Sequence, residues 1–212
     1  MKAGKLDDII QSFCGTDILR KSFLKPQFDK SDNVIVATDA HILLIAPNKY
    51  FDAAYDTNDS FPNWRAVLPS LAPMPILTIK THDILSEYLL IPLVDKFDNC
   101  QMCEGDGIHS CECGHEHDCE KCNGTGEGTN VIGQEADDTY LFKIDKIYFS
   151  PKFINKAAQV AMRLGIDNIT IHRIEEAKSL DVQINDCRLI IMPLVDIEPN
   201  EYKIIGLNTE KV

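Results

Sequence analysis

The chain has 212 residues, which is enough for one well-packed core and a small additional module. Its 44% hydrophobic and 25% charged residues are typical of globular proteins, and its apolar runs are too short to cross a bilayer. We therefore expect no membrane partner and, because the first residues lack the apolar core of a signal peptide, a cytoplasmic protein. The net charge of −12 disfavours nucleic acid as a general partner, but the segment from Lys96 to Gly128 supplies half of it, so a local basic surface elsewhere is still compatible with the composition.

The first part of the chain shows one helix pattern followed by three strand patterns. Gly15 is expected to end the helix, whose apolar residues recur at helical spacing at Leu6, Ile9, Ile10 and Phe13. The strand patterns follow at 22–28, 34–37 and 42–46, and turn residues separate them.

Less regular segments fill the middle of the chain. A proline-punctuated run covers 61–79, a short amphipathic piece covers 83–90, and LLIPLV at 89–94 is typical of a strand. After a cysteine-rich segment, strand alternation resumes at 140–149. The simplest geometry is a module inserted between two strands of one domain.

The same order of elements returns near the end of the chain. Ser150 and Pro151 are typical of a helix start, and Gly165 is typical of its end. Three strand patterns follow, within 168–174, 179–184 and 188–195. A helix and three strands, twice over, form a weak internal repeat and predict an α+β fold.

Six of the eight cysteines lie between positions 100 and 122, where C-x-x-C-x-G-x-G occurs twice. In a chain without an export signal, this clustering indicates a metal site rather than a disulfide framework. Each C-x-x-C offers two thiolates from one tight turn, and the glycines let nearby amides turn toward sulfur. The sequence predicts one structural zinc ion in a closed site made of Cys100, Cys103, Cys119 and Cys122. The isolated Cys14 and Cys187 are expected in the core.

Four further metal-binding side chains lie between the two motifs. Cys111, Cys113, His115 and His117 alternate along the chain, so a strand conformation would place them on one side. They could complete a second zinc site, or they could be solvated loop residues, because C-x-C is a poorer chelating geometry than C-x-x-C. The sequence is compatible with either a second zinc site or a solvated loop.

The duplicated cysteine motif resembles the zinc-binding region of DnaJ-type co-chaperones. That region carries four copies of the motif, whereas this chain carries two and lacks a J-domain signature. The resemblance therefore supports zinc and not chaperone activity.

Other stretches resemble, in order, segments of bacterial sliding clamps, the processivity subunits of replicative DNA polymerase. IVATDAHILLIAP at 35–47 is similar to the family's VATDGHRLA, and FPNWRAVLP at 61–69 is similar to FPDYRRVLP. The helix with its G-x-D-x-I-x-I strand entry, and LIIMPLVDI at 189–197, are similar to the end of a clamp domain. The resemblance implies a DNA-clamp-like α+β domain, in which two helix-plus-three-strand halves form antiparallel sheet. It also implies that Met192 and Leu194 correspond to positions of a groove that receives partner peptides, although packing in the core explains these two residues equally well.

Clamp rings turn their helices toward DNA, and the helix predicted at 151–164 contains no acidic residue. One stripe of this helix carries its polar side chains, which are Lys152, Lys156, Gln159 and Arg163. The stripe would contact phosphates of DNA, although an ordinary solvated face explains it equally well. Two features depart from the family. Isoleucine replaces the family's arginine after His41, which removes a positive charge. A clamp subunit has two or three such domains where this chain has about one, so a ring would need more copies of the chain.

We expect a discontinuous clamp-like domain at 1–97 and 130–198, a zinc module at 98–129 and an extension at 199–212. The leading hypothesis is a non-enzymatic sliding-clamp-like protein, associated with DNA or with a replication protein, of phage or mobile-element type and compatible with a homo-oligomer. The alternative is an adaptor of clamp fold that does not encircle DNA and whose acidic zinc module contacts a partner. Thr38, Asp39 and His41 resemble an acid–base set, but a tight turn explains them without catalysis.

Overall fold

The computed structural model describes residues 6–17, 19–57, 61–68, 75–111, 113–144, 147–174, 179–195, 197–198 and 201–206. The chain forms two compact units. We call Met1–Leu90 together with Asp138–Val212 the main unit, and Ile91–Asp137 the cysteine module. The module is wider than the expected segment 98–129, because the strands that flank the cysteines pair with each other and not with the main unit.

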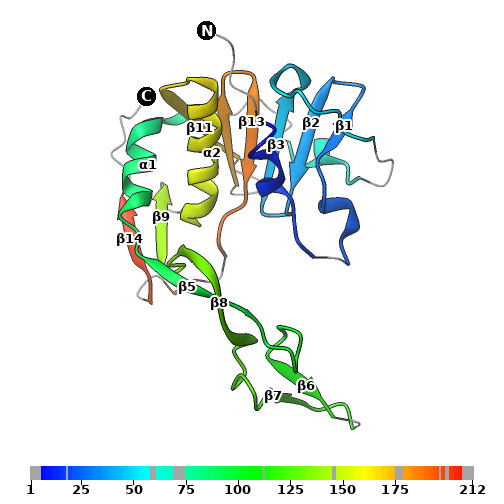
Figure 1. The fold of residues 1–212 in the computed structure, drawn as a ribbon. Helices are drawn as coiled ribbons and strands as arrows, with labels where there is room; N and C mark the ends of the chain where they lie inside the picture. The colour runs from blue at the N-terminus through cyan, green and yellow to red at the C-terminus, as the bar shows by residue number, and fades with distance from the viewer. Residues whose placement is uncertain are drawn as a thin grey trace. The chain divides into compact units, whose positions relative to one another are not determined.

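A seven-stranded antiparallel sheet dominates the main unit (Figure 1). Its order is β1-β2-β3-β13-β12-β11-β4, so strands from the two halves of the chain meet at β3 and β13. The strands are β1 (Gln27–Asp29), β2 (Val34–Thr38), β3 (Ile42–Pro47), β4 (Pro75–Lys80), β11 (Asn168–Ile174), β12 (Ser179–Ile184) and β13 (Cys187–Ile191). Together with the helices below, this sheet confirms the mixed α+β, largely antiparallel fold.

A smaller sheet in the main unit has the order β10-β9-β14. The predicted strand region 140–149 forms a hairpin of β9 (Tyr140–Ile144) and β10 (Ile147–Phe149). The last strand, β14 (Lys203–Gly206), pairs with β9 in parallel. Part of the expected C-terminal extension therefore belongs to the fold of the main unit.

Two α-helices pack side by side in the main unit, and α2 (Pro151–Leu164) lies across the face of the seven-stranded sheet (Figure 1). Proline at its first position fits the start of a helix, and Gly165 ends it with a left-handed φ of 68°. The other helix, α1 (Thr81–Leu89), includes Leu89, so the strand expected at 89–94 is wrong in its first residues. That strand begins only at Leu93.

The helix expected near the start of the chain is a short 3-10 helix, η1 (Ile10–Phe13). It stops because Cys14 is extended and the amide of Gly15 donates to the carbonyl of Phe23 rather than to the preceding turn. The strand expected at 22–28 is likewise reduced to β1, because its first residues belong to a second 3-10 helix, η2 (Lys21–Phe23). Two more 3-10 helices are η3 (Asn48–Tyr50) and η4 (Trp64–Val67).

Apolar side chains cover one face of the seven-stranded sheet and part of the other. On one face, residues such as Leu44, Leu189 and Val182 pack with the helices in the main core. On the opposite face, a smaller cluster comprises Val36, Leu43, Ile45, Trp64 and Ile190. Burial on both faces explains why β2 and β3 are almost continuously hydrophobic rather than alternating. No helix in the described part of the chain is both long and apolar enough to span a membrane.

The cysteine module consists of two hairpin-like ribbons. One pairs β5 (Leu93–Asn99) with β8 (Glu127–Ala136), and the other pairs β6 (Ile108–Ser110) with β7 (Glu116–Asp118). Most residues of all four strands are exposed. Because a lone two-stranded ribbon is only marginally stable in water, something other than a hydrophobic core must hold the module together.

Candidate metal centre

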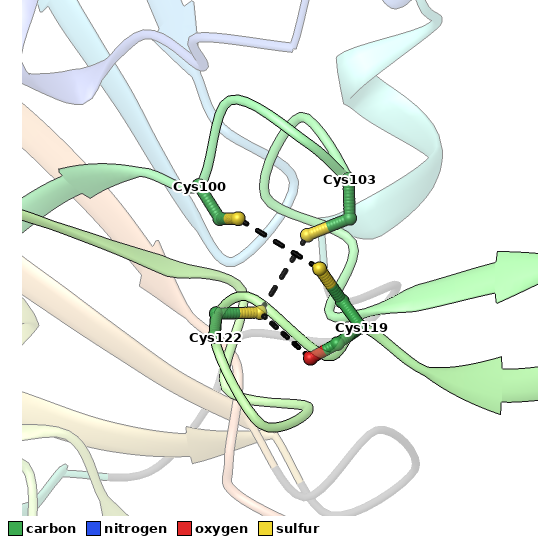
Figure 2. Close-up of side chains that lie close together, drawn as sticks. All are labelled: Cys100, Cys103, Cys119 and Cys122. Atoms are coloured by element: carbon green, nitrogen blue, oxygen red, sulfur yellow. Dashed lines mark hydrogen bonds between the residues drawn. The ribbon is translucent and has the colours of Figure 1, made fainter.

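Four buried cysteines form the centre of the module (Figure 2). Cys100 follows β5 and Cys119 follows β7, and Cys103 and Cys122 lie three residues further along in matching turns. All four sulfur atoms lie within 4.8 Å of one another. Each of the four side chains is at most 9% exposed, although strands that are largely exposed surround them. The structure thus brings together the four cysteines that the motif predicts as metal ligands.

The spacing of the sulfur atoms fits a tetrahedral zinc ion. Zn–S bonds of about 2.3 Å in a tetrahedron place neighbouring sulfurs about 3.8 Å apart. The Sγ atoms of Cys100 and Cys119 are 3.8 Å apart, and those of Cys103 and Cys122 are 3.7 Å apart (Figure 2). Since all four ligand positions are filled by protein sulfur, such a site would be structural, with no open position for water or substrate.

Backbone amides from the two glycine-rich turns support the sulfur atoms. The amide of Gly107 donates to Cys103 Sγ at 3.2 Å, and the amide of Gly126 donates to Cys122 Sγ at 3.3 Å. Hydrogen bonds of this kind stabilise thiolates and fix the orientation of metal ligands. Each motif therefore supplies a backbone hydrogen bond to one of its own cysteine sulfurs.

The two motifs also interlock. The amide of Cys100 donates to Gly126 O at 2.8 Å, and the amide of Cys119 donates to Gly107 O at 2.7 Å. A Cβ atom on Gly107 would lie 2.3 Å from Gly124 O, and one on Gly126 would lie 2.2 Å from Gly105 O. The last glycine of each C-x-x-C-x-G-x-G is therefore required because the backbone of the other copy lies against it. This reciprocal packing explains why the motif occurs twice.

The thiols of the centre differ in acidity. Backbone amides of Cys103 and Met102 lower the pKa of Cys100 to about 7, whereas burial raises the pKa of Cys119 to about 11. A bound metal ion would favour the thiolate at every position, because only the thiolate is a good ligand. Outside the module, burial raises the pKa of Cys14 to about 11 and that of Cys187 to about 12, as expected for core thiols.

The second set of predicted ligands lies at the turn between β6 and β7. Cys111, Cys113 and His115 come together there, with their ligand atoms within 4.8 Å of one another. The two cysteines are joined by a disulfide. His117 lies in β7 opposite His109 and does not belong to this group. The structure therefore gathers three of the four side chains proposed for a second site.

The polar stripe of α2 is less available to an external ligand than its sequence suggests. Lys152 is exposed, but Lys156 is largely covered and donates a hydrogen bond to the carbonyl of Ser12. Burial lowers the pKa of Lys156, and the carboxylate of Asp39 lies 4.0 Å from its Nζ.

At the far end of α2, Arg163 Nη1 lies 2.5 Å from Asp8 Oδ2, and Gln159 is half-buried. Two of the three cations in the stripe are therefore close to carboxylates of the main unit itself.

The ATDAH segment forms a hydrogen-bonded turn. Asp39 Oδ1 accepts hydrogen bonds from the amides of His41 and Ile42, both at 2.9 Å, and Thr38 Oγ1 donates to Ile42 O at 2.8 Å. These bonds allow the positive φ of Ala40 between β2 and β3. The carboxylate has a structural task here, as the sequence predicts.

A pocket of about 210 Å³ lies beside this turn, on the sheet face opposite the helices. Its walls are mostly apolar and include Leu43, Phe61, Trp64, Val67, Ile190 and Met192. The indole of Trp64 is held by a hydrogen bond from its Nε1 to Asp29 at 3.1 Å, so one wall of the pocket is fixed to β1. The resemblance pointed to Met192, which lines the pocket, and to Leu194, which is not among the lining residues. The other walls come from strands and a 3-10 helix that only the fold brings together.

Known structures share this architecture. The DNA polymerase III subunit beta from Pseudomonas aeruginosa is similar over 89% of this chain and 63% of its own length, with a TM-score of 0.50 and 12% identity. The chain has a clamp-like fold. The Caulobacter crescentus pol III beta is similar over 89% of this chain and 63% of that one, with a TM-score of 0.49 and 12% identity.

A Helicobacter pylori beta clamp bound to a DNA ligase peptide is similar over 88% of this chain and 61% of its own, with a TM-score of 0.47 and 12% identity. The chain thus spans less than two thirds of the clamps that it resembles. No protein-family profile and no curated protein sequence matches it. At these identities the likeness concerns the fold.

Proposed function

We propose that the protein is a non-enzymatic, clamp-fold scaffold associated with DNA replication, which binds partner proteins and carries one structural zinc ion. The apolar pocket on the sheet face opposite the helices carries this proposal. A scaffold protein acts through the surfaces that it offers to partners, and the pocket is a mostly apolar hollow beside the apolar cluster of this sheet face.

The pocket suits an extended peptide segment of a partner. Its volume of about 210 Å³ is small and its walls are mostly apolar, so it accommodates one or two aliphatic or aromatic side chains. The floor is rigid because Leu43 and Ile190 belong to paired central strands. A pre-formed floor reduces the ordering cost that a flexible partner peptide adds to binding.

A peptide selection tests this surface. Random short peptides displayed on phage would be selected on the full chain and on the variant Met192→Glu, which places a charge in the pocket wall without touching the main core. We expect apolar peptides that are enriched on the wild-type chain and are lost on the variant. Equal enrichment on both proteins, or none on either, would refute peptide docking in the pocket. The variant Met162→Glu is the matched control, because Met162 is an exposed methionine on α2, far from the pocket lining.

Zinc has a structural role in this proposal. Cys100, Cys103, Cys119 and Cys122 would hold it, and the ion would cross-link two ribbons that lack a hydrophobic core of their own. The acidic module would then present a defined surface to a basic partner.

DNA contact through α2 is a second candidate function, favoured by the absence of acidic residues in this helix and by the exposure of Lys152. Lys152, Lys156, Gln159 and Arg163 would meet phosphates. Neutralising Lys152, Lys156 and Arg163 together should weaken binding of a labelled DNA duplex and flatten its salt dependence. If the triple variant binds DNA like the wild type, the stripe is a solvated surface. The native mass of the purified chain would show whether copies of it assemble into a ring.

A further inference from the structure

The hairpin that joins β6 to β7 carries a second cluster of metal-binding groups, separate from the four-cysteine centre. Cys111, Cys113 and His115 present two sulfurs and one imidazole nitrogen within 4.8 Å of one another. Nδ1 of His115 lies 3.5 Å from Sγ of Cys113. Cys113 and His115 are exposed and Cys111 is half-buried, so small molecules and ions reach the cluster from solvent.

Backbone hydrogen bonds fix this cluster locally. Beyond the last strand pair, Ser110 with Glu116, the amide of Cys111 donates to His115 O at 2.9 Å. The amide of Gly114 donates to Cys111 O, also at 2.9 Å, and the φ of 82° at Gly114 turns the chain back. The three side chains are therefore held close together by a closed turn and do not depend on a distant part of the fold.

The chemistry of the cluster differs between two oxidation states. As thiolates, the cysteines and the imidazole form a Cys₂His set, which suits zinc and leaves a fourth position open to water or to a partner's side chain. As a disulfide, the same sulfurs carry no charge and are poor ligands. The structure shows the disulfide state, in which the sulfur atoms are bonded to each other. Metal binding and the disulfide thus exclude one another.

We propose that Cys111, Cys113 and His115 form a redox-gated zinc site, which binds the ion as a dithiol and releases it when the disulfide forms. The oxidant would be a small-molecule disulfide, R–S–S–R. The more exposed Cys113 thiolate attacks one of its sulfurs and releases R–S⁻, and the Cys111 thiolate then attacks the mixed disulfide and releases the second R–S⁻. Two thiolates of the protein are oxidised, one small disulfide is reduced to two thiolates, and Zn²⁺ leaves unchanged.

Native mass spectrometry of the full chain tests the proposal with Zn²⁺ as the probe. After reduction with a phosphine and addition of zinc, we expect two ions per chain, one at each of the two ligand groups. Oxidised glutathione should then remove one ion and decrease the mass of the apoprotein by two hydrogens. A reduced chain that binds one ion overturns the second site, and a second ion that survives formation of the Cys111–Cys113 disulfide overturns the gating.

Matched variants assign the ion to its ligands. His115→Ala should bind one ion, whereas His117→Ala should bind two, because His117 is an exposed histidine of the same hairpin that lies outside the cluster. The variant with both Cys111→Ser and Cys113→Ser should keep one ion and lose none to oxidised glutathione. If His115→Ala and His117→Ala bind equally, the imidazole of His115 is not a ligand. Loss of the ion from the double serine variant would show that the glutathione effect acts on the four-cysteine centre instead.

Discussion

Arg163 on α2 forms an ion pair with Asp8, with 2.5 Å between Nη1 and Oδ2. The pair joins the C-terminal turn of the helix to the segment that precedes η1, so it connects the two halves of the main unit. Both side chains remain about half exposed, and exposed pairs of this kind contribute little to stability. Its main consequence is electrostatic, because the carboxylate partly neutralises a cation at the surface of α2.

Releasing Arg163 should strengthen any DNA binding by α2. The variant Asp8→Asn removes the carboxylate but keeps the side-chain shape, so we expect tighter binding of a DNA duplex. The slope of log affinity against log salt should steepen by about 0.9 for each additional phosphate that the helix neutralises. Fluorescence anisotropy at several salt concentrations measures both quantities.

The control for this experiment is Asp17→Asn. Asp17 pairs with Arg20 at 3.6 Å on the surface, so the variant changes the net charge equally without freeing Arg163. If the two variants bind DNA alike, the effect is one of net charge, and α2 has no special role.

Removing zinc should unfold the cysteine module and leave the main unit folded. The module has its own set of contacts, and its strands are mostly exposed, so the four thiolates are its chief means of cohesion. Hydrogen exchange after chelation should show loss of protection within Ile91–Asp137 and retained protection in β12 and β13. The variant Cys100→Ser should behave in the same way. Loss of protection in both units would show that the main unit depends on the module.

The glycines that end the two cysteine motifs should be irreplaceable for a steric reason. Gly107→Ala combines a left-handed φ of 76° with a Cβ 2.3 Å from Gly124 O, so it should reduce zinc retention strongly. Gly114→Ala is the matched control, since Gly114 has a φ of 82° but no atom within 4 Å of the position that a Cβ would take. Both variants carry the backbone strain of about 1–2 kcal/mol, but only the first disturbs the packing of one motif on the other.

Competition between the protein and a zinc-binding dye measures this difference, with the Cys111–Cys113 disulfide kept intact so that only the four-cysteine centre holds zinc. Equal zinc retention in Gly107→Ala and Gly114→Ala would mean that the glycines are required for their backbone conformation alone.

Acid should loosen the wall of the apolar pocket. Burial raises the pKa of Asp29, but hydrogen bonds from Trp64, Arg65 and two backbone amides outweigh this effect, and the pKa lies below its ordinary value. Because the folded-state pKa is depressed, these bonds contribute their full stabilisation at pH values above the unfolded-state pKa of about 3.9. The stabilisation is lost as the pH falls through the folded-state pKa of Asp29.

The fluorescence of Trp64 reports on this change, because Trp64 is the chain's single tryptophan. Its emission should shift as the pH falls below about 4, and the shift should be absent in Asp29→Asn, whose indole environment is already altered at neutral pH. Asp83→Asn, on α1, should retain the shift of the wild type. An unchanged acid transition in Asp29→Asn would show that another group controls the wall.

The sequence predicted helices and strands well where neighbouring residues alone determine them, through caps and apolar periodicity. The helix at 151–164 begins with Pro151 and ends with Gly165 as expected, and the strands near 34–47 and 168–184 lie close to their predicted limits. The strand expected at 188–195 ends at Ile191. The helix expected at Leu6–Phe13 became a 3-10 helix, because the chain bends at Cys14 to bond Gly15 to Phe23. That bond joins residues eight positions apart, beyond the reach of a helical turn, and apolar periodicity carries no information about it.

By itself, the sequence determined the ligand chemistry of the cysteine module, since C-x-x-C-x-G-x-G specifies both the donor atoms and the turn that presents them. It also determined that α2 would be free of acidic side chains. Only the tertiary structure decided what these features face. It placed Asp8 against Arg163, joined Cys111 to Cys113 while leaving His117 outside their group, and opened an apolar pocket between β3, β13 and η4. The reason is that a residue's type fixes its chemistry, whereas its partner depends on how the chain folds. Strand pairing and chain reversal bring Asp8 to Arg163 and form the pocket, and the turn between β6 and β7 brings Cys111 to Cys113.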